Sequence, residues 1–386
     1  MKAIVNSNII VDSDILNGYG VLFDETILEI VKNCDLDKYI LEEVYDADGK
    51  FLSPGFIDIH IHGCKGKDTM DDNDSSILNI SRDITATGVT AFLPTTMTME
   101  FSIIEKTVNR IRKLIGNEQG AQILGCNLEG PFINDAYKGA HDGRYIIKPD
   151  FNSIKELSDV VRIVTLAPEQ EGSDEFIESC LKNGIVAAIG HSKANYEQTM
   201  RAIKKGANHF THTFNAMTPL HHRDPGAVGA AMDSSASCEL IADNVHVNPA
   251  VQRILLKVKG IDAIMLVTDA MRACLLKDGE YDFGGQRVSV KGEEARLAAG
   301  NLAGSVVTLN RALKNFIGNT GVSLADAVRT ITKNPARLLR INDSKGSISI
   351  GKDADLTLFD EEFNIYRTYV KGKNVYERLS HENRNS

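Results

Sequence analysis

Residues 54–66 read PGFIDIHIHGCKG and combine two patterns. Isoleucine and phenylalanine recur through the first half of the run, which predicts a buried β-strand. Two histidines, His60 and His62, end this run two residues apart. Because side chains alternate along a strand, both imidazoles point to the same side, as two ligands of one metal ion must. The stretch therefore predicts a buried strand with a chelating pair at its carboxyl end.

Seven more short apolar runs follow along the chain, and segments long enough for crossover helices separate them. They lie at residues 89–96, 121–130, 160–169, 184–192, 209–214, 238–247 and 263–270. Eight near-continuous apolar strands of this kind are typical of a parallel (β/α)₈ barrel, an α/β fold. We therefore expect a TIM-like barrel over residues 54–345. The alternative, a doubly wound open sheet, needs a glycine-rich nucleotide loop after its first strand, and HIHGCKG matches such a loop poorly.

The two ends of the chain have a different texture from the middle. Residues 1–53 and 346–386 contain short β-type runs separated by Asn, Asp and Gly, including GSISI at residues 346–350. These runs predict one small β-sandwich domain formed by both chain ends.

Composition limits the classes of partner. The chain has 386 residues and a net charge of −9, with no long basic run, which disfavours nucleic acid and anionic membrane surfaces. No apolar run reaches the ~20 residues of a membrane helix, and the first residues lack the pattern of a signal peptide. The six cysteines show no CxxC spacing, so we expect neither a disulfide framework nor a thiolate zinc site. We expect a cytoplasmic protein with a small-molecule substrate.

Histidines and carboxylates gather at the ends of the predicted strands. In a barrel, these carboxyl ends meet at one rim, where active sites are built. Each residue alone could be structural: a histidine hydrogen-bonded at a strand end, a buried acid, or a helix cap. Together they indicate a catalytic zinc, iron or similar divalent ion rather than a closed structural zinc site. The set is His60, His62, Glu129, His191, His212, His246 and Asp269.

These residues and their surroundings resemble the amidohydrolase superfamily and, within it, the N-acetylglucosamine-6-phosphate deacetylases. The matching segments occur in family order: PGFIDIHIHG, GCNLEGPFIN, KGAHD, AIGHS, THTFNAMTPLHHRDPGAVGA, IADNVHV, LVTDAM and NLAGS. The resemblance implies metal-dependent hydrolysis of the acetamide of N-acetylglucosamine 6-phosphate to glucosamine 6-phosphate and acetate, in amino-sugar catabolism. Alternatives are a deacetylase of N-acetylgalactosamine 6-phosphate, another amidohydrolase such as a cyclic-amide hydrolase or deaminase, and a metal-free barrel serving as an interaction module.

The resemblance also implies roles for the rim residues. Glu129, His191 and His212 match the ligands of the metal that the family shares, while His60 and His62 indicate a second ion that shares Glu129 and is approached by Asp269. One or two divalent ions per subunit follow, with Zn²⁺ favoured and Fe²⁺ as the alternative. The predicted strand four has no terminal lysine for carbamylation, which argues against the dihydroorotase and urease branch.

Asp269 and His141 match catalytic positions, and a larger set of residues matches the substrate site. Asp269 matches the general base and acid, since a carboxylate beside the attacking water can take its proton and pass it to the leaving amine. Arg223 matches a phosphate ligand contributed by the neighbouring subunit, which implies a homodimer. Asn244 stands where the family usually has glycine, before His246, and asparagine tolerates a left-handed backbone better than most residues. His141 matches the residue that donates a hydrogen bond to the acetyl carbonyl oxygen. The predicted substrate site comprises Ala140, His141, Asn215, Ala216, Arg223, His246, Leu302, Ala303, Gly304 and Ser305.

Overall fold

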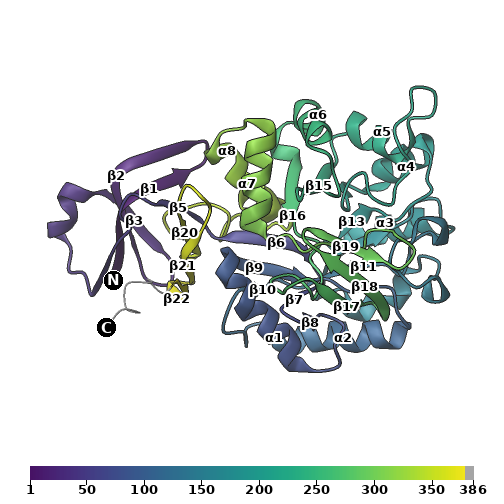
Figure 1. Cartoon of the computed structure of the whole chain (residues 1–386), viewed down its shortest axis with the longest axis horizontal. Helices are drawn as coiled ribbons and strands as arrows, with labels where there is room; N and C mark the ends of the chain where they lie inside the picture. The colour runs from purple at the N-terminus through teal and green to yellow at the C-terminus, as the bar shows by residue number, and fades with distance from the viewer. Residues whose placement is uncertain (379–386) are drawn as a thin grey trace.

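Eight parallel strands form the centre of the computed structural model, which describes residues 1–378 (Figure 1). Parallel ladders join the first two strands and, in chain order, the last six. Single parallel bridges, from Thr95 to Asn127 and from Ile61 to Ala270, connect the remaining neighbours and close the ring. The predicted strands are all present, and the sheet curls into a TIM-like barrel. They are β6 (Phe56–Ile61), β9 (Val89–Pro94), β11 (Cys126–Glu129), β12 (Val161–Leu166), β13 (Val186–Ile189), β14 (His209–Phe210), β15 (Ser237–Ile241) and β16 (Ile264–Val267).

Helices surround most of the barrel and cover its apolar outer face. Side chains such as Ile57 and Ile59 join helix residues such as Ile77 and Val108 in the largest hydrophobic cluster of the molecule. The connection between β11 and β12 carries only short 3₁₀ turns, η3 (Asp135–Tyr137) to η6 (Lys155–Leu157). The α-helices are α1 (Asp74–Asp83), α2 (Phe101–Leu114), α3 (Ser173–Lys182), α4 (Tyr196–Lys205), α5 (Gly226–Asp233), α6 (Pro249–Lys259), α7 (Leu309–Thr320), α8 (Leu324–Arg329) and α9 (Lys333–Leu338).

Strands from both chain ends pair in a second sheet, which lies at one end of the molecule (Figure 1). The link between the two ends is the antiparallel pairing of β5 with β20, and the rings of Phe23 and Tyr369 meet at 5.3 Å. The sandwich form of this sheet and the domain boundaries at 53/54 and 345/346 stay predictions, and residues 379–386 lie outside the described chain. The strands are β1 (Lys2–Val11), β2 (Asp14–Phe23), β3 (Ile27–Lys32), β4 (Glu43–Asp46), β5 (Phe51–Pro54), β20 (Leu356–Phe359), β21 (Ile365–Val370) and β22 (Lys373–Glu377).

The expectation of a strand at residues 346–350 is wrong. Gly346 has a left-handed φ of 84°, which a regular strand does not contain. Just before it, the Lys345 ammonium binds the carboxylates of Asp353 and Asp355 at 2.7 and 2.6 Å. These ion pairs bend residues 345–355 into a loop.

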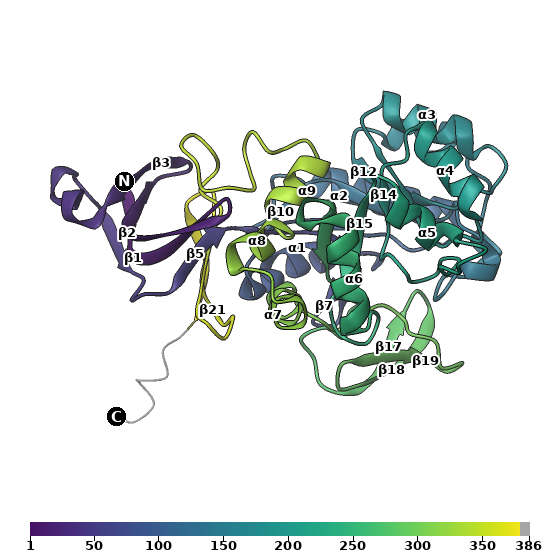
Figure 2. The same ribbon diagram turned by 90° about the horizontal axis from the view of Figure 1, so that it is seen from above.

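A three-stranded antiparallel sheet between β16 and α7 was not predicted. It consists of β17 (Gly279–Phe283), β18 (Gln286–Lys291) and β19 (Glu294–Leu297), and Figure 2 shows it standing to one side of the barrel. Its apolar face, including Phe283 and Val288, forms a small core with Met97 and Ala140 from the barrel loops. Three further short strands are β7 (Gly63–Cys64), β8 (Lys67–Asp68) and β10 (Gln122–Ile123).

Within residues 1–378, no helix is both long enough and apolar enough to span the hydrocarbon layer of a lipid bilayer.

Candidate active site

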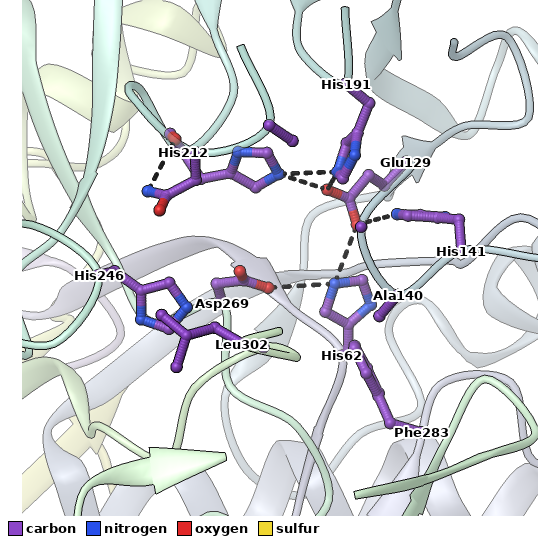
Figure 3. Close-up of a pocket in the computed structure, with 14 residues that line it drawn as sticks. His62, Glu129, Ala140, His141, His191, His212, His246, Asp269, Phe283 and Leu302 are labelled. Carbon is purple, nitrogen blue, oxygen red and sulfur yellow. Dashed lines mark hydrogen bonds and ion pairs between the residues drawn. The ribbon is translucent and has the colours of Figure 1, made fainter. Parts of the chain in front are cut away.

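A pocket opens at the carboxyl ends of the barrel strands (Figure 3). Its volume is about 180 Å³. It collects side chains from strands that are far apart in the sequence, as the parallel topology requires. The lining residues are His62, Glu129, Gly139, Ala140, His141, His191, His212, Asn215, Ala216, His246, Asp269, Phe283, Leu302 and Gly304.

Two kinds of backbone position bring the predicted ligands together. Glu129 is the last residue of β11, whereas His191, His212 and Asp269 each lie two residues beyond a barrel strand. These last three residues have φ angles of 49°, 28° and 48°, which are uncommon for residues with a side chain. At each of these three positions, the left-handed backbone makes a sharp turn at the rim of the barrel. Such outliers cost free energy and cluster at functional sites, so they mark this rim as the candidate site.

The Glu129 carboxylate lies between two groups of side chains (Figure 3). Its Oε1 atom is 3.1 Å from His191 Nε2 and 3.0 Å from His212 Nε2. Its Oε2 atom is 3.1 Å from His62 Nε2 and 3.6 Å from His60 Nε2. Asp269 Oδ1 completes the second group, at 3.3 Å from His62 Nε2 and 3.5 Å from His60 Nε2. One carboxylate thus faces two clusters of nitrogen ligands.

The electrostatics of the pocket favour positive charge beside the two carboxylates. Burial opposes ionisation of Glu129, but His60 and His141 outweigh it and hold the pKa of Glu129 well below its usual range. Burial likewise opposes protonation of His62, but its hydrogen bonds to Asp269 and Glu129 raise its pKa to about 9. A divalent cation would satisfy the same carboxylates.

In two candidate ligands, His191 and His60, the hydrogen bond of Nδ1 determines which ring nitrogen carries the lone pair. His191 Nδ1 is 2.8 Å from the carbonyl oxygen of Tyr137, and His60 Nδ1 is 2.9 Å from a carboxylate oxygen of Glu239. Because both partners only accept, each Nδ1 carries the proton, and a neutral ring directs its Nε2 lone pair into the site. Burial lowers the pKa of His191 to about 4, which keeps that ring neutral. The donor set therefore fits a divalent metal held by imidazole and carboxylate.

His141 has the opposite tautomer. The backbone N–H of Thr98 donates to His141 Nδ1 at 3.1 Å, so the proton of a neutral ring lies on Nε2. That atom points into the pocket, 3.4 Å from Glu129 Oε2. His141, Glu129 and His191 are close enough to hold one ion, but a protonated Nε2 has no lone pair to give. The geometry therefore favours His141 as a hydrogen-bond donor and not as a metal ligand.

Most of the predicted substrate residues lie around the same pocket. Ala140, Asn215, Ala216, Leu302 and Gly304 line it. His246 also lines the pocket, and its Nδ1 is 2.6 Å from Asp243 Oδ2, which orients the ring. Asn244 has a φ of 68°, so the asparagine adopts the left-handed backbone that glycine would take.

Three predicted substrate residues do not line the pocket. Arg223 is exposed on the loop after β14, and its guanidinium contacts His222 at 2.7 Å. Ala303 is buried in the small core beneath the β17–β19 sheet. Ser305 donates to the backbone carbonyls of Thr268 (from Oγ, 2.5 Å) and Asp269 (from N, 2.8 Å), and so holds the Asp269 backbone.

Two lining residues were not predicted from the sequence, Gly139 and Phe283. The Phe283 ring meets the His62 ring edge-on, with the centroids 5.1 Å apart. A signal was available, because Gly284 and Gly285 form a two-residue turn between alternating runs, a pattern typical of a β-hairpin.

Known proteins resemble this chain over most of its length. The model of the amidohydrolase family matches residues 51–375. The N-acetylglucosamine-6-phosphate deacetylase of Bacillus subtilis is 38% identical over 96% of this chain and 94% of its own length. The N-acetylgalactosamine-6-phosphate deacetylase of Escherichia coli O157:H7 is 36% identical over 86% of this chain and 89% of its own. The crystal structure of N-acetylglucosamine-6-phosphate deacetylase from Pasteurella multocida superposes with a TM-score of 0.91 at 31% identity, covering 97% of this chain and 99% of that one. The chain therefore belongs to the amidohydrolase family, and within it to the group of N-acetylglucosamine-6-phosphate deacetylases.

Proposed function

We propose that this chain hydrolyses the acetamide of N-acetylglucosamine 6-phosphate, releasing glucosamine 6-phosphate and acetate, in amino-sugar catabolism. The observation that carries the proposal is the placement of Glu129 between two imidazole groups, with Asp269 and the Nε2–H of His141 at the same pocket. Amide hydrolysis needs metal ligands, a proton carrier and an oxyanion donor, and these side chains supply all three. The names of the relatives agree with this reaction.

The metal ligands are divided between two groups. Glu129, His191 and His212 would hold the principal ion, and His60 and His62, with Glu129 and Asp269, would hold a second. When bound, a divalent ion polarises a carbonyl and lowers the pKa of a coordinated water from 15.7 towards ~7. Imidazole and carboxylate ligands suit Zn²⁺, with Fe²⁺ as the alternative. Zinc, a homodimer, a cytoplasmic location and the sandwich form of the terminal sheet stay predictions.

Asp269 and His141 would move or hold protons around the acetyl group. The Asp269 carboxylate borders the pocket and can take a proton from the attacking water and deliver it to the leaving amine. The proton on His141 Nε2 can be donated to the acetyl carbonyl oxygen as negative charge develops there. The hydrogen bond from the Thr98 N–H favours this tautomer.

The sugar and phosphate would be bound at the outer part of the pocket. Asn215, Ala216 and His246 line it, and the backbone around Gly304 is also at its wall. Arg223 is exposed on its own chain, which is compatible with a role in a neighbouring subunit's site. A guanidinium suits bidentate contact with phosphate, so we assign Arg223 to the phosphate of the partner's substrate in a homodimer.

A second candidate substrate is N-acetylgalactosamine 6-phosphate, since a relative with 36% identity carries the name of that deacetylase. The test is amine release by the purified chain from both acetylated sugar phosphates, with metal content measured on the same sample. Faster turnover of the glucosamine derivative supports the proposal. Faster turnover of the galactosamine derivative selects the second candidate, and no release from either one refutes both.

A further inference from the structure

Glu239 is a buried carboxylate inside the barrel that the proposed reaction does not use. It lies in the middle of β15 with none of its surface exposed. Its Oε2 atom is 2.9 Å from His60 Nδ1 and 2.9 Å from the backbone nitrogen of His212. Its Oε1 atom is 3.1 Å from His209 Nε2. Among residues 1–378, its ion-pair partners are these two histidine rings, with no lysine or arginine.

The chemistry of these contacts gives each hydrogen bond a direction. An ionised carboxylate only accepts, so His60, His209 and the His212 backbone all donate to Glu239. The proton on His60 Nδ1 leaves the Nε2 lone pair of a neutral ring facing Glu129 and Asp269.

The contact with His212 acts on the backbone. His212 has a φ of 28°, and the hydrogen bond from its N–H to Glu239 ties this unusual turn to β15. The next residue adds a second tie, because the Thr213 N–H donates to the Glu239 carbonyl oxygen at 3.0 Å. Among residues 1–378, His212 Nδ1 has no hydrogen-bond partner, so the backbone turn and the contacts of Nε2 with Glu129 and His191 orient the ring.

We propose that Glu239 is a positioning residue that couples the two metal-ligand groups, by setting the tautomer of His60 and the backbone turn at His212. The inference rests on the proposed metal roles of these histidines. It predicts that a change at Glu239 weakens metal binding in both groups, although Glu239 belongs to neither.

The test is Glu239→Leu in the full-length chain. A glutamine would not be decisive, because His60 Nδ1 and the His212 N–H share the oxygen Oε2 and one amide oxygen in that place could accept from both. A leucine is of similar size but has no acceptor, so His60 Nδ1–H and the His212 N–H both lose their partner. We expect the affinity for Zn²⁺, measured by competition with a chelator, to fall by about 10–100-fold, the usual effect of losing an outer-shell partner.

Comparison with two variants makes the result specific. His60→Ala should weaken the binding step of its own group and spare the step held by Glu129, His191 and His212. Glu239→Leu should weaken every Zn²⁺ step that the wild type shows. Asp355→Asn is the matched control, because Asp355 is a buried carboxylate paired with Lys345 and lies outside the pocket lining. Its Zn²⁺ affinity should equal that of the wild type.

Circular dichroism and thermal melting establish that each variant is folded. If Glu239→Leu does not fold, Glu239→Asp replaces it, since the shorter side chain keeps the charge but cannot reach His60 and His212 together. Its Zn²⁺ affinity should lie below that of the wild type at every step. Wild-type affinity in the folded variant overturns the proposal, as does a loss confined to the step that His60→Ala weakens. A wild-type chain that binds Zn²⁺ without releasing amine refutes the substrate assignment alone.

Discussion

Replacing Asp269 with asparagine separates proton transfer from metal binding. The Asp269 backbone is held independently of its side chain: its N–H donates to the His60 carbonyl oxygen at 2.8 Å, and its carbonyl accepts from the Ser305 N–H at 2.8 Å. Asparagine has nearly the same shape and keeps these bonds. The left-handed φ of 48° is also well tolerated by asparagine. We therefore expect a folded variant with an unchanged pocket outline.

The size of the effect follows from the place of the carboxylate. Asp269 Oδ1 lies 3.3 Å from His62 Nε2 and 3.5 Å from His60 Nε2, in the second ligand group. In the principal group, the His191 ring contacts Glu129 instead. The principal metal should stay bound while the proton acceptor is lost. Removing a general acid or base costs ~10²–10⁴-fold in turnover, equivalent to ~3–5 kcal/mol in the barrier. Because one residue serves both proton transfers, we expect a loss near the upper end of this range.

The assay is steady-state amine release, with metal content and melting temperature measured on the same preparation. A fall in kcat with KM within about threefold of wild type would indicate a transition-state role. Asp282→Asn is the control, since Asp282 is a half-exposed carboxylate of β17 outside the pocket lining, and it should keep its turnover. Turnover of Asp269→Asn within about tenfold of wild type would refute the role, because general acid–base loss is larger.

Three other substitutions test the remaining assignments. Glu129→Ala removes the carboxylate common to both ligand groups and should abolish metal binding and activity together. Full metal content in this variant would refute the assignment of Glu129 as a metal ligand. His141→Ala should lower kcat by ~10²–10³-fold, as loss of an oxyanion donor does, with metal content unchanged, whereas loss of the metal would make His141 a ligand. Mixing inactive Arg223→Ala with inactive Asp269→Asn forms heterodimers, and each heterodimer should regain up to about half the activity of the wild-type dimer, because one of its two sites keeps both residues. If mass spectrometry confirms subunit exchange and no activity returns, Arg223 does not act across an interface.

The barrel was predictable because its strands are buried on both faces. Such strands have nearly continuous apolar sequences, and eight of them with long connections leave few possible topologies. The meeting of the candidate ligands at one rim was predictable for a related reason, since the carboxyl ends of parallel strands meet whatever the loops do. His191 and His212, 21 residues apart in sequence, have their Nε2 atoms 2.9 Å apart.

Elements held by side-chain contacts between distant segments were harder to predict. The run at residues 346–350 has a strand-like sequence, yet the ion pairs of Lys345 with Asp353 and Asp355 bend the chain. Phe283 reaches the pocket only because its hairpin packs on Met97 and Ala140. Neither interaction has a periodic signature. Glu239 did leave a signal, because a carboxylate within the apolar run CELIA must find buried hydrogen-bond donors.

The alternation of residues 57–62 explains why a buried strand ends in two imidazoles. Ile57, Ile59 and Ile61 lie on one face of β6 and join the core beneath the helices. Residues 58, 60 and 62 occupy the other face, towards the barrel interior, and each is polar.

A buried polar group without a partner costs roughly 2–7 kcal/mol, so an interior filled in this way is stable only where partners exist. Asp58 accepts from the Thr268 hydroxyl at 2.6 Å, and His60 donates to Glu239 one layer higher. His62, at the top, has its Nε2 towards Glu129 and Asp269, while its Nδ1 has no hydrogen-bond partner among residues 1–378. The lower layers are thus satisfied by the protein itself, and the layer at the pocket depends on what the two carboxylates bind.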